Sequence, residues 1–89
     1  MKGLEHYRAQ IVRMAADYGA THVRIVDPDA DAGGSLDLLV DMDPGRSLFD
    51  LVDLAQEVGE LLGRPVDVIA EATLSPTLRA KVLATAREL

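Results

Sequence analysis

The sequence predicts a small α/β (α+β) domain, a mixed three-stranded sheet packed by three helices in the order α-β-β-α-β-α. In three segments, apolar residues recur at three- and four-residue intervals, as they do on one face of a helix. These segments are 4–18, 48–62 and 76–86. Three short segments, 22–26, 36–42 and 66–70, are β-branched or alternate between apolar and polar residues, as strands do. Because 89 residues suffice for one core, residues 1–89 are expected to form a single domain.

The expected helices begin and end at residues suited to those positions. The first ends at Gly19, because glycine readily adopts the left-handed conformation of a C-terminal cap. The second begins at Ser47, which is expected to cap it together with Asp50, and it ends at Gly63. The third begins at Ser75-Pro76, which places serine at the N-cap and proline at the first helical position.

The connections between strands predict how the sheet is paired. The first two strands are joined by a short polar segment, 27–34, which favours antiparallel pairing. A helix joins the second strand to the third, and such crossovers link parallel strands. If these two strands are neighbours, Asp37 and Asp67 lie close together on one face of the sheet.

These two aspartates are unusual because each lies within a short apolar strand. Side chains alternate along a strand, so Asp37 and Asp41 should point away from the face that carries Leu38 and Val40. Burial disfavours a charged carboxylate unless it has a partner, a cation or access to water. Asp37 and Asp67 therefore suggest a paired-carboxylate site.

Composition excludes several classes of protein. A net charge of −6 and an aromatic content of 3% argue against direct binding of nucleic acid, which needs a basic face and usually stacking rings. There is no cysteine, so no disulfide framework or thiolate metal site is expected. No apolar run approaches the roughly 20 residues of a membrane span, and no signal peptide is evident. We expect a cytoplasmic protein with a basic protein partner or a cation as ligand.

Several segments together resemble a known family. The run Asp-Leu-Leu-Val-Asp at 37–41 is followed by Pro-Gly-Arg-Ser-Leu at 44–48 and by Leu-Gly-Arg-Pro-Val-Asp-Val-Ile at 62–69. They resemble the minimal nucleotidyltransferase (MNT) domains of the polymerase-beta-like nucleotidyltransferase superfamily, over nearly the whole chain. The resemblance implies a nucleotidyltransferase-like fold. Active members bind nucleotide phosphates with a Gly-Ser pair, and they hold two divalent cations with a Ser-Asp-x-Asp motif and a later aspartate.

The resemblance assigns roles to particular residues. Asp37 falls on the second metal ligand and Asp67 on the third carboxylate, which implies residual catalytic and Mg²⁺-binding positions. Ser35 stands where the first carboxylate belongs, and a hydroxyl is a poorer ligand for a hard cation. Gly33, Gly34 and Ser35 contain a Gly-Ser pair and are weak candidates for nucleotide binding, because the pair precedes the second strand instead of following the first.

The segment 27–31 departs further from the family. Pro28 lacks a backbone N–H donor, and the acids at positions 27, 29 and 31 would repel a triphosphate. The alternate acids superficially resemble a calcium loop, but Ala32 and Leu38 occupy the positions where such a loop needs glycine and glutamate. Whether Asp29 or Asp31 folds back to replace the missing ligand stays open.

Three functions are consistent with these residues. The leading one, implied by the resemblance, is a degenerate domain without a required cofactor that acts as an antitoxin by binding a HEPN-type ribonuclease toxin. The alternative is an active enzyme that uses Mg²⁺ and ATP to transfer a nucleoside monophosphate to a protein acceptor. In the third, Asp37 and Asp67 are structural and pair with Arg24 or Arg64, while Asp41 is solvated or caps a turn. A homo-oligomer stays open in all three.

Overall fold

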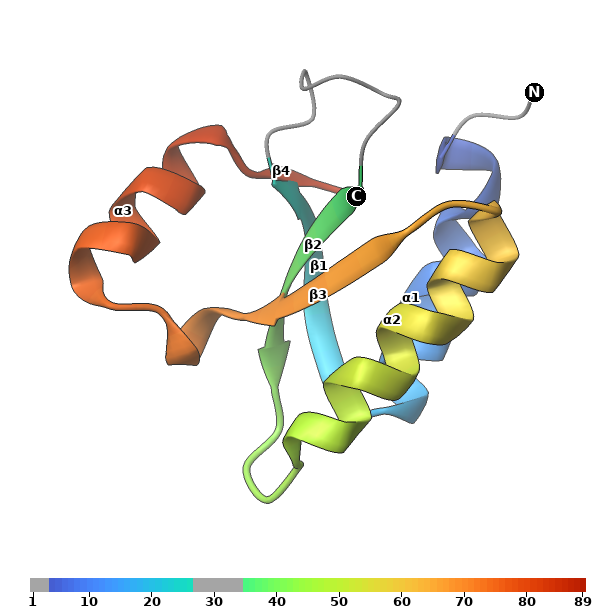
Figure 1. Ribbon diagram of the computed structural model, residues 1–89, viewed down its shortest axis with the longest axis horizontal. Coiled ribbons are helices and arrows are strands. Elements are labelled where there is room, and N and C mark those ends of the chain that lie inside the picture. Colours follow the sequence, from blue (N-terminus) through green and yellow to red (C-terminus); the bar gives the residue numbers. More distant parts are fainter. Residues whose placement is uncertain (1–3, 27–34) are drawn as a thin grey trace.

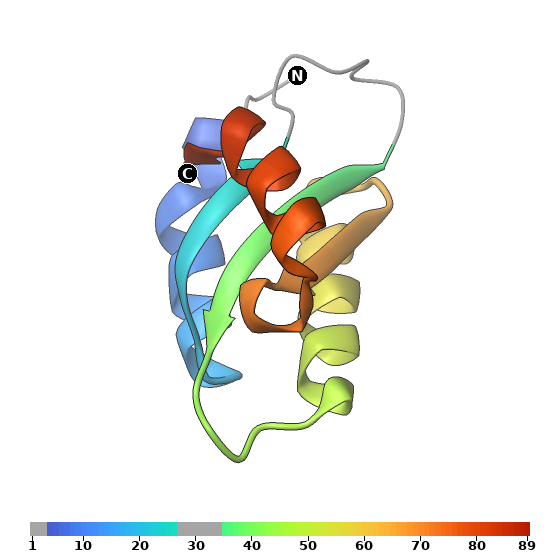
Figure 2. The ribbon, with the colours of Figure 1, turned by 90° about the vertical axis from the view of Figure 1, so that its left-hand side faces the viewer.

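The computed structural model describes residues 4–26 and 35–89, which form a sheet between two layers of helices (Figure 1). Helices α1 and α2 cover one face of the sheet, and α3 lies over the other (Figures 1 and 2). In chain order the elements are a 3₁₀ helix η1 (Leu4–Tyr7), α1 (Arg8–Asp17), β1 (Ala20–Val26), β2 (Leu36–Met42), α2 (Leu48–Leu62), β3 (Val66–Ala70), a second 3₁₀ helix η2 (Glu71–Thr73), α3 (Pro76–Thr85) and β4 (Arg87–Glu88).

The sheet confirms the predicted fold class and pairing. Its strands follow the order β3-β2-β1-β4. Strands β1 and β2 are antiparallel, whereas β2 and β3, which α2 connects, are parallel. The strand order places β2 beside β3, so the residues of these two strands that carry the aspartates face each other across one ladder.

The fourth strand was not predicted. The expected third helix ran to residue 86, but α3 ends at Thr85, and Arg87–Glu88 pair antiparallel with β1. The Leu89 N–H also donates to the Val23 carbonyl oxygen at 3.2 Å. Two residues are too few to show a strand period, and this strand exists because the edge of β1 offers backbone partners.

The helix ends agree with the expected capping residues. Gly19 and Gly63 have φ values of +79° and +69°, which glycine adopts without steric cost. The Asp50 carboxylate accepts a hydrogen bond from the Ser47 N–H at 3.0 Å, and the Ser75 hydroxyl oxygen accepts one from the Leu78 N–H at 3.2 Å. The first helix is shorter than predicted, because its first turn is the 3₁₀ helix η1.

The main core lies between the sheet and the α1/α2 layer. It includes Ile11, Leu38, Val40 and Val58, each at most 1% exposed, as the alternation along β2 predicted. Leu39 is equally buried on the opposite face, where η2 contacts β2. The middle of β2 is therefore covered on both sides, and the acids of this strand occupy its two ends.

Candidate functional site

Asp37 and Asp67 are brought together by the parallel pairing of β2 and β3. They are register partners across the ladder, each at the second position of its strand. Leu38 and Val68, the next residues of the two strands, pack in or against the main core, so the two aspartates share the opposite face. The expected juxtaposition is observed, whereas the catalytic and metal-binding roles stay predictions.

The surroundings of this pair make Asp37 harder to ionise. Asp37 is partly buried and Asp67 is exposed. Desolvation raises the pKa of Asp37 above its ordinary value, and the neighbouring negative charge of Asp67 raises it further. A divalent cation bound between the carboxylates of Asp37 and Asp67 would instead lower the pKa of both groups, because it stabilises their ionised forms. The donor set therefore fits a hard cation in charge and in atom type.

The same donor set is small. Within residues 4–26 and 35–89, no group of three or more histidine, aspartate or glutamate side chains is arranged to hold a metal ion. Ser35, the residue at the position of the first family carboxylate, is exposed and directly precedes β2. Gly33, Gly34, Asp29 and Asp31, which the sequence analysis considered for nucleotide or metal binding, lie outside the described residues.

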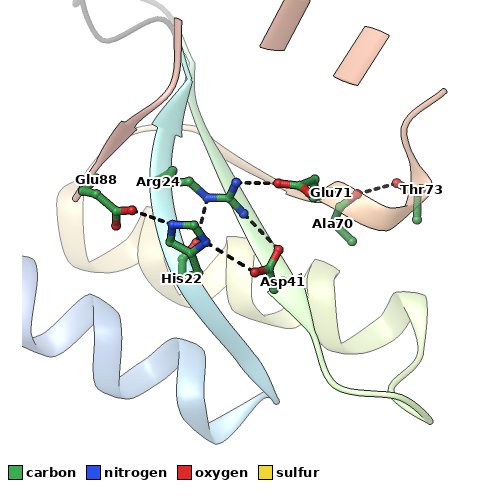
Figure 3. A network of polar contacts seen from close by, with 7 residues as sticks. All are labelled: His22, Arg24, Asp41, Ala70, Glu71, Thr73 and Glu88. Atoms are coloured by element: carbon green, nitrogen blue, oxygen red, sulfur yellow. Dashed lines mark hydrogen bonds and ion pairs between the residues drawn. The ribbon is translucent and has the colours of Figure 1, made fainter. Parts of the chain in front are cut away.

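Sequence analysis missed a polar network around Arg24, on the same side of the sheet as Asp41 (Figure 3). Arg24 is only 5% exposed. Its guanidinium donates to the carboxylates of Asp41, at 3.0 Å, and of Glu71, and its Nε donates to the His22 carbonyl oxygen at 3.0 Å. The His22 ring lies between two carboxylates, with Nδ1 near Asp41 and Nε2 near Glu88.

This network corrects two expectations. Asp41 neither caps a turn nor is simply solvated, because it accepts from the buried Arg24 guanidinium. Arg24 pairs with Asp41 and Glu71, so it does not provide the structural partner that was considered for Asp37 and Asp67. The available signal was an arginine within the β-branched run 22–26, because a buried cation requires carboxylates nearby.

The network has a structural role. Its residues come from β1, β2, η2 and β4, so it links the last strand and the second 3₁₀ helix to the centre of the sheet. Arg24 satisfies its donors within the protein, which leaves the aspartate pair as the candidate for chemistry.

In the described part of the chain, no helix is both long and apolar enough to cross a bilayer.

Comparison with known proteins supports a nucleotidyltransferase-like fold. No family model matches the sequence. A solved structure described provisionally as a minimal nucleotidyltransferase superposes with a TM-score of 0.84 at 36% identity, covering 97% of this chain and 92% of that chain. Fold and acid pair thus define a nucleotidyltransferase-like domain. At this identity and coverage, the chain belongs to the minimal nucleotidyltransferase family.

Two further proteins are similar over smaller shares or at lower identity. A protein of Methanocaldococcus jannaschii, provisionally named a protein adenylyltransferase, is 42% identical over 48 residues, which are 54% of this chain and 52% of that relative. The match therefore spans about half the length of this relative. A complex of a tri-AMPylated Shewanella oneidensis HEPN toxin with an MNT antitoxin gives a TM-score of 0.73 at 15% identity, covering 94% of this chain and 69% of that chain. The second likeness shows the shared fold.

Proposed function

We propose that this chain is an antitoxin that neutralises a HEPN-type ribonuclease toxin by binding it, while its own nucleotide-transfer site is degenerate. The observation that carries the proposal is the incomplete acid set. Asp37 and Asp67 stand side by side, whereas Ser35 occupies the position at which the family has its first carboxylate.

The ligands at this site determine how strongly it would hold magnesium. Mg²⁺ prefers charged oxygen ligands, and nucleotide transfer by this superfamily uses two cations to stabilise the attacking and leaving oxygens. Asp37 and Asp67 would hold a cation if one bound, but the Ser35 hydroxyl contributes no negative charge. Desolvation and the charge of Asp67 raise the pKa of Asp37, so protons compete with a cation for this carboxyl group more than they do at an ordinary aspartate.

The net charge of the chain indicates what kind of partner it binds. The chain has a net charge of −6, and a ribonuclease that handles RNA needs basic surface. Opposite charges steer association and favour the correct partner. The MNT antitoxin of Shewanella oneidensis, which has the same fold, is found in complex with a HEPN toxin. These observations support a role in which this chain binds a basic protein partner.

The second candidate is an active nucleotidyltransferase. It is favoured by the register pairing of Asp37 and Asp67, and by the provisional name of the Methanocaldococcus jannaschii relative. On this alternative the chain would use Mg²⁺ and ATP and would transfer a nucleoside monophosphate to a side chain of the toxin. A third acid would be required, and Asp29 and Asp31, in the segment that precedes the strand bearing Asp37, are the candidates.

The proposal is tested with the product of the gene adjacent to that of this chain, which the proposal predicts to be a HEPN-type ribonuclease. Its ribonuclease activity is measured with the purified chain present, in buffer that contains a chelator and no ATP. We expect one stable complex in gel filtration and suppressed cleavage, with the same result for Asp37→Ala. Failure to form a complex would overturn the antitoxin role. Neutralisation that requires ATP and is lost in Asp37→Ala would favour the active enzyme.

A further inference from the structure

A groove of about 440 Å³ lies between the first half of α2 and the strand β3. Its walls are mainly apolar and include Leu48, Val52 and Ala55 from α2, with Val66 and Val68 from β3. Strand β3 is an outer strand of the sheet, and Figure 1 shows α2 and β3 diverging from the connection that joins them. The groove therefore opens beside the unpaired edge of the sheet.

Three large apolar side chains at the start of α2 are exposed, and two of them, Leu48 and Val52, line the groove. Leu48 is 71% exposed, Phe49 is 79% exposed and Val52 is 54% exposed. They lie within five consecutive residues of α2 and form one patch, which we call the α2 patch (Leu48, Phe49 and Val52). A clustered apolar patch next to an open strand edge is typical of a protein interaction site, whereas single exposed apolar residues are common.

The charges of α2 and β3 restrict what this face of the molecule can bind, although the acids of α2 lie outside the groove lining and Asp50 pairs with Arg46 at 3.8 Å. Helix α2 contains no lysine or arginine, and its charged side chains are all acidic: Asp50, Asp53, Glu57 and Glu60. The only charged residue of β3 is Asp67, which also lines the groove. A second copy of this chain would bring the same acids into the contact, so electrostatic repulsion disfavours self-association through this face.

We propose that the α2 patch and its groove dock a segment of the toxin in which apolar side chains are flanked by lysine or arginine. The identity of the partner rests on the proposed function, whereas the chemistry of the segment rests on the groove itself. Apolar anchors fill the space between α2 and β3, and the basic flanks face the acids of α2.

The first test measures binding of the toxin by titration calorimetry. The double variant Phe49→Ala, Val52→Ala should weaken binding at least about tenfold, because exposed aromatic anchors contribute strongly to interfaces. Val12→Ala on α1 and Leu83→Ala on α3 are matched controls, being 46% and 41% exposed. We expect these controls to stay within about twofold of the wild type. Equal affinity of the double variant and the controls would overturn the docking proposal and leave the antitoxin role intact.

The second test does not use the toxin. A synthetic amphipathic peptide of leucine and lysine is titrated into the ¹⁵N-labelled chain, and amide chemical shifts are followed. We expect the shifts to concentrate in the first half of α2 and in β3, and to vanish in the double variant. Shifts confined to α1 or α3, or no shifts, would contradict the proposal. If the toxin does not bind but the peptide maps to the groove, the antitoxin role fails and the docking surface stands.

Discussion

Asp37 on β2 and Asp67 on β3 face each other directly across a parallel ladder, on the side of the sheet opposite the main core. The α2 crossover produces this arrangement, because it returns the chain parallel to β2 and beside it. Like charges placed directly opposite each other on a sheet oppose folding, whereas a cation between them would favour it. The behaviour of this pair can therefore be measured through stability as well as through activity.

The first prediction concerns the dependence of stability on pH. The pKa of Asp37 in the folded protein lies above its ordinary value of 3.8, because of desolvation and of Asp67. Between these two pKa values the folded state binds more protons than the unfolded state, so stability falls as pH rises through this window. The penalty is complete above the folded pKa and absent below about 3.8. Asp37→Asn should thus stabilise the protein near neutral pH by about 0.2–1 kcal/mol.

Urea denaturation at neutral pH and at a pH below 3.8 measures this difference. Glu60→Gln, at an exposed position of α2, is the control. This variant should not show the stabilisation at neutral pH, relative to low pH, that is expected for Asp37→Asn. If Asp37→Asn were destabilising at neutral pH, the carboxylate would have a stabilising partner that the pairing with Asp67 does not explain.

The second prediction concerns magnesium. A ligand that binds only the folded state raises the free energy of unfolding, by about 1.4 kcal/mol at ten times its dissociation constant. We expect millimolar Mg²⁺ to raise the thermal midpoint of the wild type, and to leave Asp37→Asn and Asp67→Asn unchanged. Calcium and a matched concentration of NaCl separate coordination from general screening. Identical midpoints with and without Mg²⁺ would show that the pair no longer serves as a cation site.

The third prediction concerns Arg24. Removing one partner of a buried ion pair leaves the remaining charges uncompensated, so Arg24→Ala should cost about 3 kcal/mol in urea denaturation. Asp41 and Glu71 retain some access to water, which limits the loss. Arg8→Ala, on the exposed surface of α1, should stay within about 0.5 kcal/mol of the wild type. A loss below about 1 kcal/mol would place the network among ordinary surface ion pairs.

The order of helices and strands could be predicted from local signals. The bounds of β2 and β3 agree with the alternating segments 36–42 and 66–70. A short run that alternates between apolar and polar residues, with turn-forming residues at its ends, is enough to define such a strand. The start of α3 was similarly clear from Ser75 followed by Pro76. These features depend on residues that are near one another in the sequence.

Several features that depend on distant residues were not predicted, or were predicted only through an inferred topology. Strand β4 exists through its pairing with β1, and two residues carry no period of their own. Asp41 was misassigned because its partner Arg24 belongs to another strand, and the other carboxylate that binds Arg24, that of Glu71, belongs to η2. The placement of Asp37 beside Asp67 could be expected only once the crossover had been inferred. The groove beside β3 depends on the divergence of α2 from the sheet, which no short segment specifies.

The most direct test of the central claim is a transfer assay with ATP labelled on the α-phosphate. The chain, Mg²⁺ and the protein encoded by the adjacent gene are incubated together, and both proteins are then examined for label. A degenerate site predicts that neither protein acquires label, although the chain still suppresses the ribonuclease. Label on the toxin that disappears in Asp37→Ala would contradict this account and establish an active nucleotidyltransferase.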